Sequence, residues 1–286
     1  MATSKHIDEI TGTETTGHEW DGITELNTPM PTWWLWTFYV CILFSVVYMV
    51  LFPAWPWLSG YTKGMLGYSS RERHLERMAE VQSERSVWYD KFANRSVEEI
   101  GEDYELMQFA MAGGRTIFAD NCAPCHGTGG AGAPNYPVLV DDAWMWGGTL
   151  PEIYQTIRYG IRNDHPDTRL SEMPAFGADE LLTEEQIAAV ADYVLSLSGH
   201  GSASAEGTMI FAENCASCHG DDGKGMTELG APNLTDAIWL YGDSRDAVIS
   251  QITKPRLGVM PPWIGRLDDV EIKQAAVYVH GLGGGQ

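Results

Sequence analysis

The sequence predicts an all-α protein with one N-terminal transmembrane helix followed by two tandem helical domains. Three observations predict this fold class. A run of twenty uncharged residues lies near the N-terminus, a stretch of about ninety residues then occurs twice, and each copy ends with apolar residues at helical spacing. With 286 residues, 44% of them hydrophobic, the chain is long enough for an anchor and two modest domains.

The uncharged run, Trp33–Phe52, is predicted to cross a membrane. Twenty helical residues at about 1.5 Å each span a hydrocarbon core of about 30 Å. Residues 1–32 are acidic and no small-residue cleavage site follows the run, so it is an anchor and not a cleaved signal peptide. Cys41 within it is interpreted as a small apolar residue. Aromatic belts mark both ends, formed by Trp33, Trp34, Trp36, Trp55 and Trp57.

Residues 53–104 are predicted to form a charged helical linker. Ser69 and Glu72 have the spacing of a capping box, and Arg and Glu alternate after them around a few apolar residues. Two interpretations stay open for this helix, a solvated stalk and a surface that packs against a neighbouring subunit.

The repeat defines two domains, 105–197 and 207–286, joined by a small-residue linker at 198–206. Its centre is NCAPCHG, which returns 93 residues later as NCASCHG. Neither copy contains an alternating strand pattern. The first closing helix has Thr183 as its predicted N-cap, with Gln186 three residues later. Outside the centre, the matched pairs are Ile117-Phe118 with Ile210-Phe211, Ala133-Pro134-Asn135 with Ala231-Pro232-Asn233, Trp144 with Trp239, and Met173-Pro174 with Met260-Pro261.

The formal charge of −21 argues against nucleic acid as a partner, because phosphate binding requires clustered Lys and Arg. The acidic residues are spread along the whole chain. Two explanations remain open, attraction of a basic soluble partner and simple solubility.

The repeated Cys-x-x-Cys-His string is the attachment signature of c-type haem. Two thiols on one turn can each form a thioether to the haem edge, and the next histidine then faces the iron. A zinc ribbon would need its second CxxC about 15–20 residues away, and a thioredoxin-like dithiol would need a βαβ context. The sequence therefore predicts two covalently bound haem c groups, held by Cys122, Cys125 and His126, and by Cys215, Cys218 and His219.

Met173 and Met260 are the predicted sixth ligands, since each precedes a proline and each has a counterpart in the other repeat. His/Met ligation suits electron transfer. Met145 and Met226 compete for this role but have no counterparts. Pairing of each methionine with the histidine of its own repeat is the default, and a crossed pairing stays open.

Further predictions concern the residues around the ligands. The carbonyls of Pro134 and Pro232 are the expected acceptors for the second ring nitrogen of each haem histidine. His165 has no counterpart in the second repeat and is interpreted as a loop histidine, near a partner surface.

Each repeat resembles a class I cytochrome c domain, and the whole chain resembles the dihaem membrane subunit, subunit III, of cbb3-type cytochrome c oxidase. The discriminating stretches are DGITELNTPMPTWWLWTFY at the anchor and IRNDHPDTRLSEMPAFG around Met173. The resemblance implies electron transfer from a cytochrome c donor toward the monohaem subunit, and from there to the haem–copper subunit that reduces oxygen. The chain itself would then be a non-catalytic electron-transfer subunit of the respiratory chain. The family's haem-binding positions fall on Cys122, Cys125, His126 and Met173, and on Cys215, Cys218, His219 and Met260, with His126, Met173, His219 and Met260 as iron ligands.

Two observations disagree about the orientation of the chain in the membrane. Four basic residues follow the anchor and only Lys5 precedes it, so the positive-inside rule places the C-terminal bulk in the cytoplasm. Haem c is attached outside the cytoplasmic membrane, which requires periplasmic domains. The cofactor is given precedence, because the basic residues are sparse and mixed with acids. The expected location is the bacterial inner membrane, crossed once.

Other functions compete with this one. A dihaem peroxidase needs an open iron site, which a methionine in both repeats opposes. A cytochrome subunit of a membrane-bound dehydrogenase is disfavoured by the anchor motif, and no feature supports a gas sensor or assembly factor.

Overall fold

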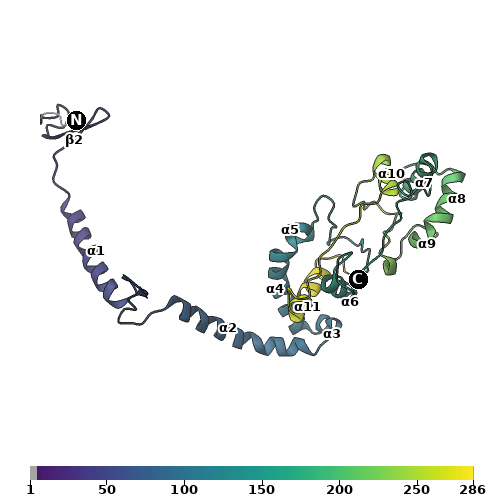
Figure 1. Ribbon diagram of the computed structural model, residues 1–286, viewed down its shortest axis with the longest axis horizontal. Helices are drawn as coiled ribbons and strands as arrows, with labels where there is room; N and C mark the ends of the chain where they lie inside the picture. The colour runs from purple at the N-terminus through teal and green to yellow at the C-terminus, as the bar shows by residue number, and fades with distance from the viewer. Residues whose placement is uncertain (1–4, 286) are drawn as a thin grey trace. The chain divides into compact units, whose positions relative to one another are not determined.

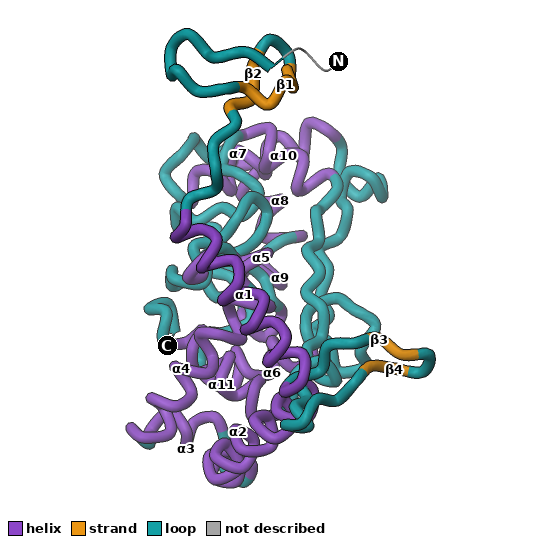
Figure 2. Tube along the Cα trace, turned by 90° about the vertical axis from the view of Figure 1, so that its left-hand side faces the viewer, coloured by secondary structure: helices purple, strands orange, loops and turns teal. Residues whose placement is uncertain are grey.

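The computed structural model describes residues 5–285, so the outermost residues of the predicted ranges 1–32 and 207–286 lie outside it. The chain divides into two compact units, residues 1–84 and 85–286, which are described separately. The regular secondary structure of the described chain is mainly helical, as predicted (Figures 1 and 2). We call residues 85–286 the head.

Helix α1, Thr32–Leu51, agrees with the predicted span to within one residue at each end. None of its side chains is buried by the rest of the chain, and its length and hydropathy suffice to cross a membrane. Thr37 and Ser45 donate their hydroxyls to the carbonyls four residues earlier. Both polar groups are thus satisfied inside the helix, as a hydrocarbon environment requires. Cys41 is exposed on this helix.

Strands appear before and after α1, where none was predicted. Strands β1, Thr15–Trp20, and β2, Ile23–Leu26, form an antiparallel hairpin closed by Asp21-Gly22. Both turn residues have positive φ, 50° and 85°, as the type I′ turn requires, and Asp-Gly is a strong signal for it. A smaller pair, β3 (Pro56–Trp57) and β4 (Gly60–Tyr61), follows the anchor.

Helix α2, Ser70–Ala93, begins where predicted, and Ser69 Oγ accepts the Glu72 N–H at 3.2 Å. Its last turns are part of the head. The Trp88 ring stacks on Phe109 at 4.7 Å, and Phe92 is fully buried. The head therefore begins near residue 85 and not at the predicted boundary of 105, because these apolar side chains pack into its core.

The remaining helices all lie in the head. Both closing helices, α7 and α11, are confirmed, and Thr183 caps α7 in a capping box with Gln186 as predicted. The elements are α3 (Val97–Glu102), α4 (Tyr104–Asn121), α5 (Ala123–His126), α6 (Leu150–Tyr159), α7 (Glu184–Leu197), α8 (Ala205–Asn214), α9 (Ala216–His219), α10 (Arg245–Thr253) and α11 (Asp269–His280), with 3₁₀ turns at Thr128–Gly130 and Thr227–Leu229.

The two closing helices are exchanged between the repeats. Helix α11 packs against α4 and α6 of the first repeat, and α7 packs against α8 and α10 of the second. Figure 1 shows the yellow α11 beside the teal α4. The sequence repeats at 105–197 and 207–286 are therefore not the two packing units.

Equivalent residues make the same contact in both places. Phe118 lies 5.3 Å from the Tyr278 ring, and its repeat partner Phe211 lies 5.0 Å from the Tyr193 ring. Glycines allow the helices this close: a Cβ at Gly114 would lie 2.2 Å from the Gln274 carbonyl oxygen, and one at Gly207 equally close to the Ala189 carbonyl oxygen. The exchange thus rests on paired features of both repeats.

Two hydrophobic cores result. The first core joins α2, α3, α4, α6 and α11, and the second joins α7, α8 and α10. The short linker after α7 explains the arrangement, because a short loop between two helices favours their antiparallel packing. Once α7 covers α8, only α11 remains to cover α4. The chain crosses between cores twice, in segments that we call crossing 1 (residues 160–183) and crossing 2 (residues 254–268).

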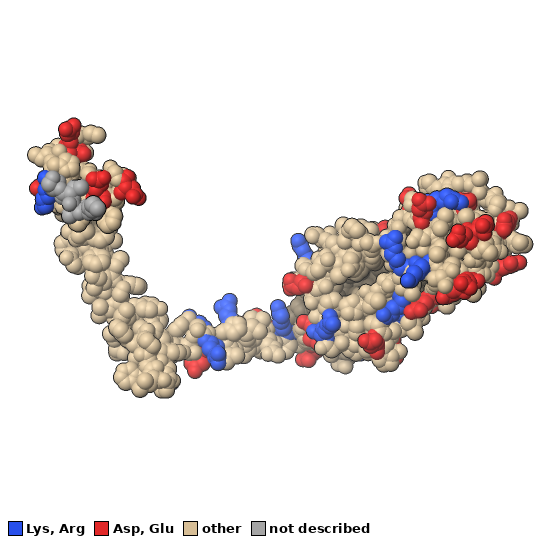
Figure 3. Space-filling model, turned by 45° about the horizontal axis from the view of Figure 1, so that its top comes forward, with Lys and Arg blue, Asp and Glu red and all other residues tan. Residues whose placement is uncertain are grey.

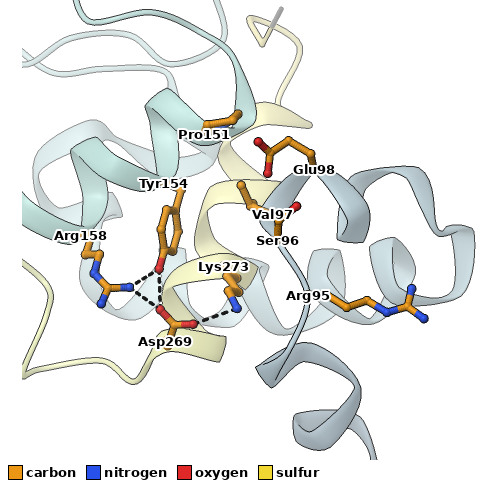
Figure 4. A pocket seen from close by; sticks show the side chains of 9 residues that line it. All are labelled: Arg95, Ser96, Val97, Glu98, Pro151, Tyr154, Arg158, Asp269 and Lys273. Atoms are coloured by element: carbon orange, nitrogen blue, oxygen red, sulfur yellow. Dashed lines mark hydrogen bonds and ion pairs between the residues drawn. The ribbon is translucent and has the colours of Figure 1, made fainter.

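An ion pair supports each exchanged helix. Asp269 on α11 accepts from Arg158 on α6, and Asp192 on α7 accepts from Arg245 on α10 at 2.6 and 3.0 Å. The Asp269 carboxylate also accepts from Tyr154 and from Lys273, the latter at 2.9 Å (Figure 4). This cluster borders a cavity of about 450 Å³ between α3, α6 and α11. None of the predicted haem residues lines this cavity, so we assign it no role in haem binding.

Candidate functional site

The two CxxCH motifs have the same local structure. A long helix ends at the first cysteine, a single turn carries the second cysteine and the histidine, and a glycine with φ of 75° or 76° ends the turn. The N–H groups of Cys125 and His126 both bond to the Cys122 carbonyl, and the second motif repeats this. Two thiols and one imidazole thus lie on one turn, which is the geometry that haem attachment requires.

Each histidine ring is held from behind by a proline carbonyl. His126 Nδ1 lies 3.2 Å from the Pro137 oxygen, and His219 Nδ1 lies 3.1 Å from the Pro232 oxygen. The prediction for Pro232 is confirmed and that for Pro134 is wrong. The loop bonds explain the error: Leu139 and Leu234 occupy equivalent positions, so Pro137 and not Pro134 is the counterpart of Pro232.

Burial lowers the pKa of His126 and of His219, and the bond to the proline carbonyl opposes this only in part. Both rings are therefore neutral at physiological pH, with Nδ1 donating and Nε2 left as a metal ligand. Burial, with a smaller effect of the second thiol, raises the pKa of Cys122 and of Cys215 to about 11. An uncharged thioether is compatible with such a position.

Each methionine packs against the core of the other repeat's CxxCH motif. Met260 packs against the first core, which contains Cys122, and Met173 packs against the second core beside Cys215. This packing favours the crossed pairing, which the sequence left open, over the default of own-repeat pairing, and it has the same cause as the exchange of the closing helices. In the described chain, neither Met145 nor Met226 packs against a core.

Backbone hydrogen bonds fix the two segments that carry Met173 and Met260, which we call the methionine segments. Ile161 and Met260 exchange a pair of N–H···O bonds at 3.0 Å, and Asn163 Nδ2 donates to the Met260 carbonyl at 2.9 Å. On the other side, the N–H groups of Gly177 and Ala178 donate to the Thr253 carbonyl at 3.2 and 3.0 Å. Each methionine is thereby tied to the repeat that it does not belong to in sequence.

Two indole nitrogens, Trp146 Nε1 and Trp239 Nε1, are buried without a partner in the described protein. Buried N–H groups are rarely left unpaired, so each calls for an acceptor that the protein does not supply. A propionate carboxylate of haem is such an acceptor. Trp144 differs from its repeat partner Trp239, because its indole N–H donates to the Gly284 carbonyl.

His165 lies in the loop where it was predicted. Its backbone N–H donates to Asn163 Oδ1, and its ring packs on Tyr159 at 5.0 Å. No three His, Cys, Asp or Glu side chains within residues 5–285 converge as a metal site would require.

Family models match the anchor and most of the head. The description "N-terminal domain of cytochrome oxidase-cbb3, FixP" applies to residues 12–59, and "Cytochrome C oxidase, cbb3-type, subunit III" to residues 109–194 and 202–279. The chain is also 51% identical to a cbb3-type cytochrome c oxidase subunit FixP from Bradyrhizobium sp. (strain ORS 278), with all of both chains covered. It belongs to the subunit III (FixP/CcoP) family of cbb3-type cytochrome c oxidase.

Other relatives agree. Identity is 51% with a subunit CcoP of Azospirillum sp. (strain B510), covering 98% of each chain, and 50% with the CcoP of Cereibacter sphaeroides, covering 95% of each. Membership makes the chain an electron-transfer cytochrome c subunit of a membrane-associated oxidase, which has other subunits. Its cytochrome c domains imply haem c, and the split match implies two such domains.

Sequence reasoning missed Asn163, which donates to the Met260 carbonyl, Arg162, which donates to the Gly258 and Ser171 carbonyls, and Trp146 with its buried indole N–H. Arg162, Asn163 and Trp146 have no counterparts in the repeat comparison. The discriminating stretch IRNDHPDTR contains Arg162 and Asn163 and is the available sequence signal for both. For Trp146 no signal was available, because its unpaired N–H is visible only in three dimensions.

Proposed function

We propose that the chain carries two covalently attached haem c groups, one on Cys122 and Cys125 and one on Cys215 and Cys218. The residues present fit the group in three respects: both thiols and the histidine share one turn, both imidazoles are neutral, and buried indole N–H groups await an acceptor. When bound, haem c supplies one-electron redox chemistry.

The proposed iron ligands are crossed, His126 with Met260 and His219 with Met173. The observation that supports this is the packing of each methionine in the core of the other repeat's CxxCH motif. A thioether in the sixth position favours ferrous iron and leaves no open site, which suits electron transfer and not oxygen chemistry.

The proposed partners are a cytochrome c donor, the monohaem subunit and the catalytic haem–copper subunit. Electrons would pass from the donor through this chain to the monohaem subunit, and from there to the haem–copper subunit. Membership of the oxidase family supports this route. The chain would cross the bacterial inner membrane once, through α1, with both haem domains in the periplasm where haem c is attached.

Mass spectrometry of the intact protein tests the cofactors. We expect two haem additions that survive acid–acetone extraction, and one addition after Cys215→Ala and Cys218→Ala together. One haem in the unaltered chain, or bound zinc, would contradict the proposal.

Purification from detergent extracts tests the route. We expect the haem–copper and monohaem subunits to co-purify. Recovery with a substrate dehydrogenase would favour the dehydrogenase alternative, and hydrogen peroxide turnover by the isolated chain would favour a peroxidase.

A further inference from the structure

Arg162 contacts both methionine segments with a single guanidinium group. Its Nε donates to the Gly258 carbonyl at 2.8 Å, and its Nη1 donates to the Ser171 carbonyl at 3.0 Å. Gly258 lies two residues before Met260, and Ser171 lies two residues before Met173. One side chain therefore bonds to the equivalent carbonyl of both segments.

The surroundings of Arg162 indicate that these two bonds are its main interactions. The side chain is half-buried, and burial lowers its pKa, with weaker opposing effects of Tyr241 and Glu172. Within residues 5–285 no carboxylate lies within ion-pair distance of it. A guanidinium offers several N–H donors in a fixed planar fork, so it can bond two carbonyls at once where a lysine ammonium cannot hold the same geometry.

The backbone at Arg162 is also unusual. Its φ is +49°, in the left-handed region that residues other than glycine rarely adopt. Directly before it, Ile161 is paired with Met260, and directly after it, Asn163 donates to the Met260 carbonyl. The contacts of Ile161 and Asn163 with Met260 on crossing 2 therefore impose the positive φ of Arg162. Such strained backbone positions often occur at functional sites.

We propose that Arg162 is a positioning residue that holds both axial methionines, and so couples the ligation of the two haems. The inference rests on the proposed assignment of Met173 and Met260 as iron ligands. The Arg162 guanidinium bonds to the backbone carbonyls of Gly258 and Ser171, so it acts through the backbone on each methionine.

The test is displacement of methionine from ferric iron by added imidazole, measured by absorption on the full chain carrying both haems. Each haem is assigned in a Met260→His or Met173→His background, where only the remaining His/Met haem reports. In Arg162→Lys, which keeps the charge, we expect imidazole affinity to rise about tenfold at both haems, because a charge-assisted hydrogen bond to each segment is lost.

Two matched controls lie on the same crossing. Arg169 is also half-buried, but its guanidinium bonds to Thr156, the Glu152 carbonyl and Gln155 and to neither methionine segment. Arg169→Lys should change imidazole affinity less than twofold. Asn163→Ala should raise it only at the haem that Met260 ligates. If Arg162→Lys does not accumulate, Arg162→Gln replaces it with the same expected direction.

The outcomes separate the inference from the assignment beneath it. If Arg162→Lys affects one haem only, or no more than Arg169→Lys does, Arg162 does not couple the methionines. If neither Met260→His nor Met173→His changes the imidazole affinity of either haem relative to the unaltered chain, the methionines are not the iron ligands. That result would contradict the proposed function itself.

Discussion

The two cores of the head contain the same parts in different chain orders. The second core is continuous, since crossing 1 brings Met173 and α7 to the helices that directly follow them. The first core is discontinuous, built from residues 85–159 and completed by Met260 and α11 at the end of the chain. A sequence repeat therefore identifies equivalent positions without identifying which copies pack together.

The first core is also larger, because α2 and α3 add Phe92, Val97 and Ile100 to it. Its closing helix is held by the cluster of Arg158, Tyr154 and Lys273 around Asp269, whereas α7 has a single bidentate partner, Arg245. We expect the second core to be the less stable of the two. Four pairs of variants test this comparison, in order of decreasing expected effect.

The largest effect is expected from a charge placed in each closing helix. Ala276 on α11 and Ala191 on α7 are equivalent and fully buried. Burial of an unpaired carboxylate costs several kcal/mol. Hydrogen exchange should show Ala276→Asp exposing the amides of α4 and Ala191→Asp exposing those of α8. If Ala276→Asp instead exposed α8, the exchange of helices would be refuted.

Ligand replacement in a single-haem chain comes next. With Cys215→Ala and Cys218→Ala, only the first motif carries haem. Met260→His should then lower the midpoint potential by on the order of 100 mV, because axial ligands move haem potentials over about 0.8 V in total. Met173→His should leave that potential unchanged. A redox titration measures both, and a shift from Met173→His would restore own-repeat ligation.

Smaller effects follow from the two ion pairs. Burial raises the pKa of Asp269, but bonds from Tyr154 and Lys273 outweigh it, so the pKa is lowered overall. The bond from Arg245 lowers the pKa of Asp192 against a weak effect of burial. Both carboxylates therefore stabilise the fold above the ordinary aspartate pKa of about 3.9, and this stabilisation is lost as pH falls through their folded values.

Thermal melts at several pH values check this. At pH 7, Asp269→Asn should cost about 1–2 kcal/mol, since it leaves hydrogen-bonding partners unpaired. Asp192→Asn should cost under about 1 kcal/mol, as for exposed pairs. Both differences should shrink in acid, and a constant difference down to pH 2 would show that charge is not the cause.

The smallest effect concerns the acidic surface. Figure 3 shows acidic side chains (red) toward the end of the head formed by α7 and α8. Reduction by a basic cytochrome c should slow with rising ionic strength, since salt screens attraction over about 8–10 Å. Asp221→Asn with Asp222→Asn should weaken this dependence, because both are exposed beside His219.

The control for that experiment has to lie on the first repeat. Glu184 and Glu185 at the start of α7 are unsuitable, because α7 packs in the second core. Asp120→Asn with Asp142→Asn removes two exposed carboxylates from the first repeat instead. Stopped-flow rates that do not vary with salt would leave solubility as the role of the charge.

Much of this could be predicted because the signals were local. A run without charges, a Thr183 cap and a CxxCH turn each depend on residues close in sequence, and each is found where expected. The crossed packing could not be predicted, because α4 and α8 are equivalent in the repeat. The repeat alone therefore does not say which of them α11 packs against. Only the short loop after α7 decides between them. The prediction for Pro134 was wrong because the Ala-Pro-Asn strings match in sequence, whereas the loop bonds align Pro137 with Pro232.

The exchange also sets an order of assembly. The aromatic contact that closes the second core, Tyr193 with Phe211, joins residues 18 apart, whereas Phe118 and Tyr278 are 160 apart. Closing the longer loop costs about 2 kcal/mol more in chain entropy, and α11 is synthesised after both α4 and α8. The CxxCH motif that leaves the ribosome first therefore belongs to the domain that is completed last. A chain that stops before α11 would keep the whole first repeat in sequence and still lack the helix that closes the first core.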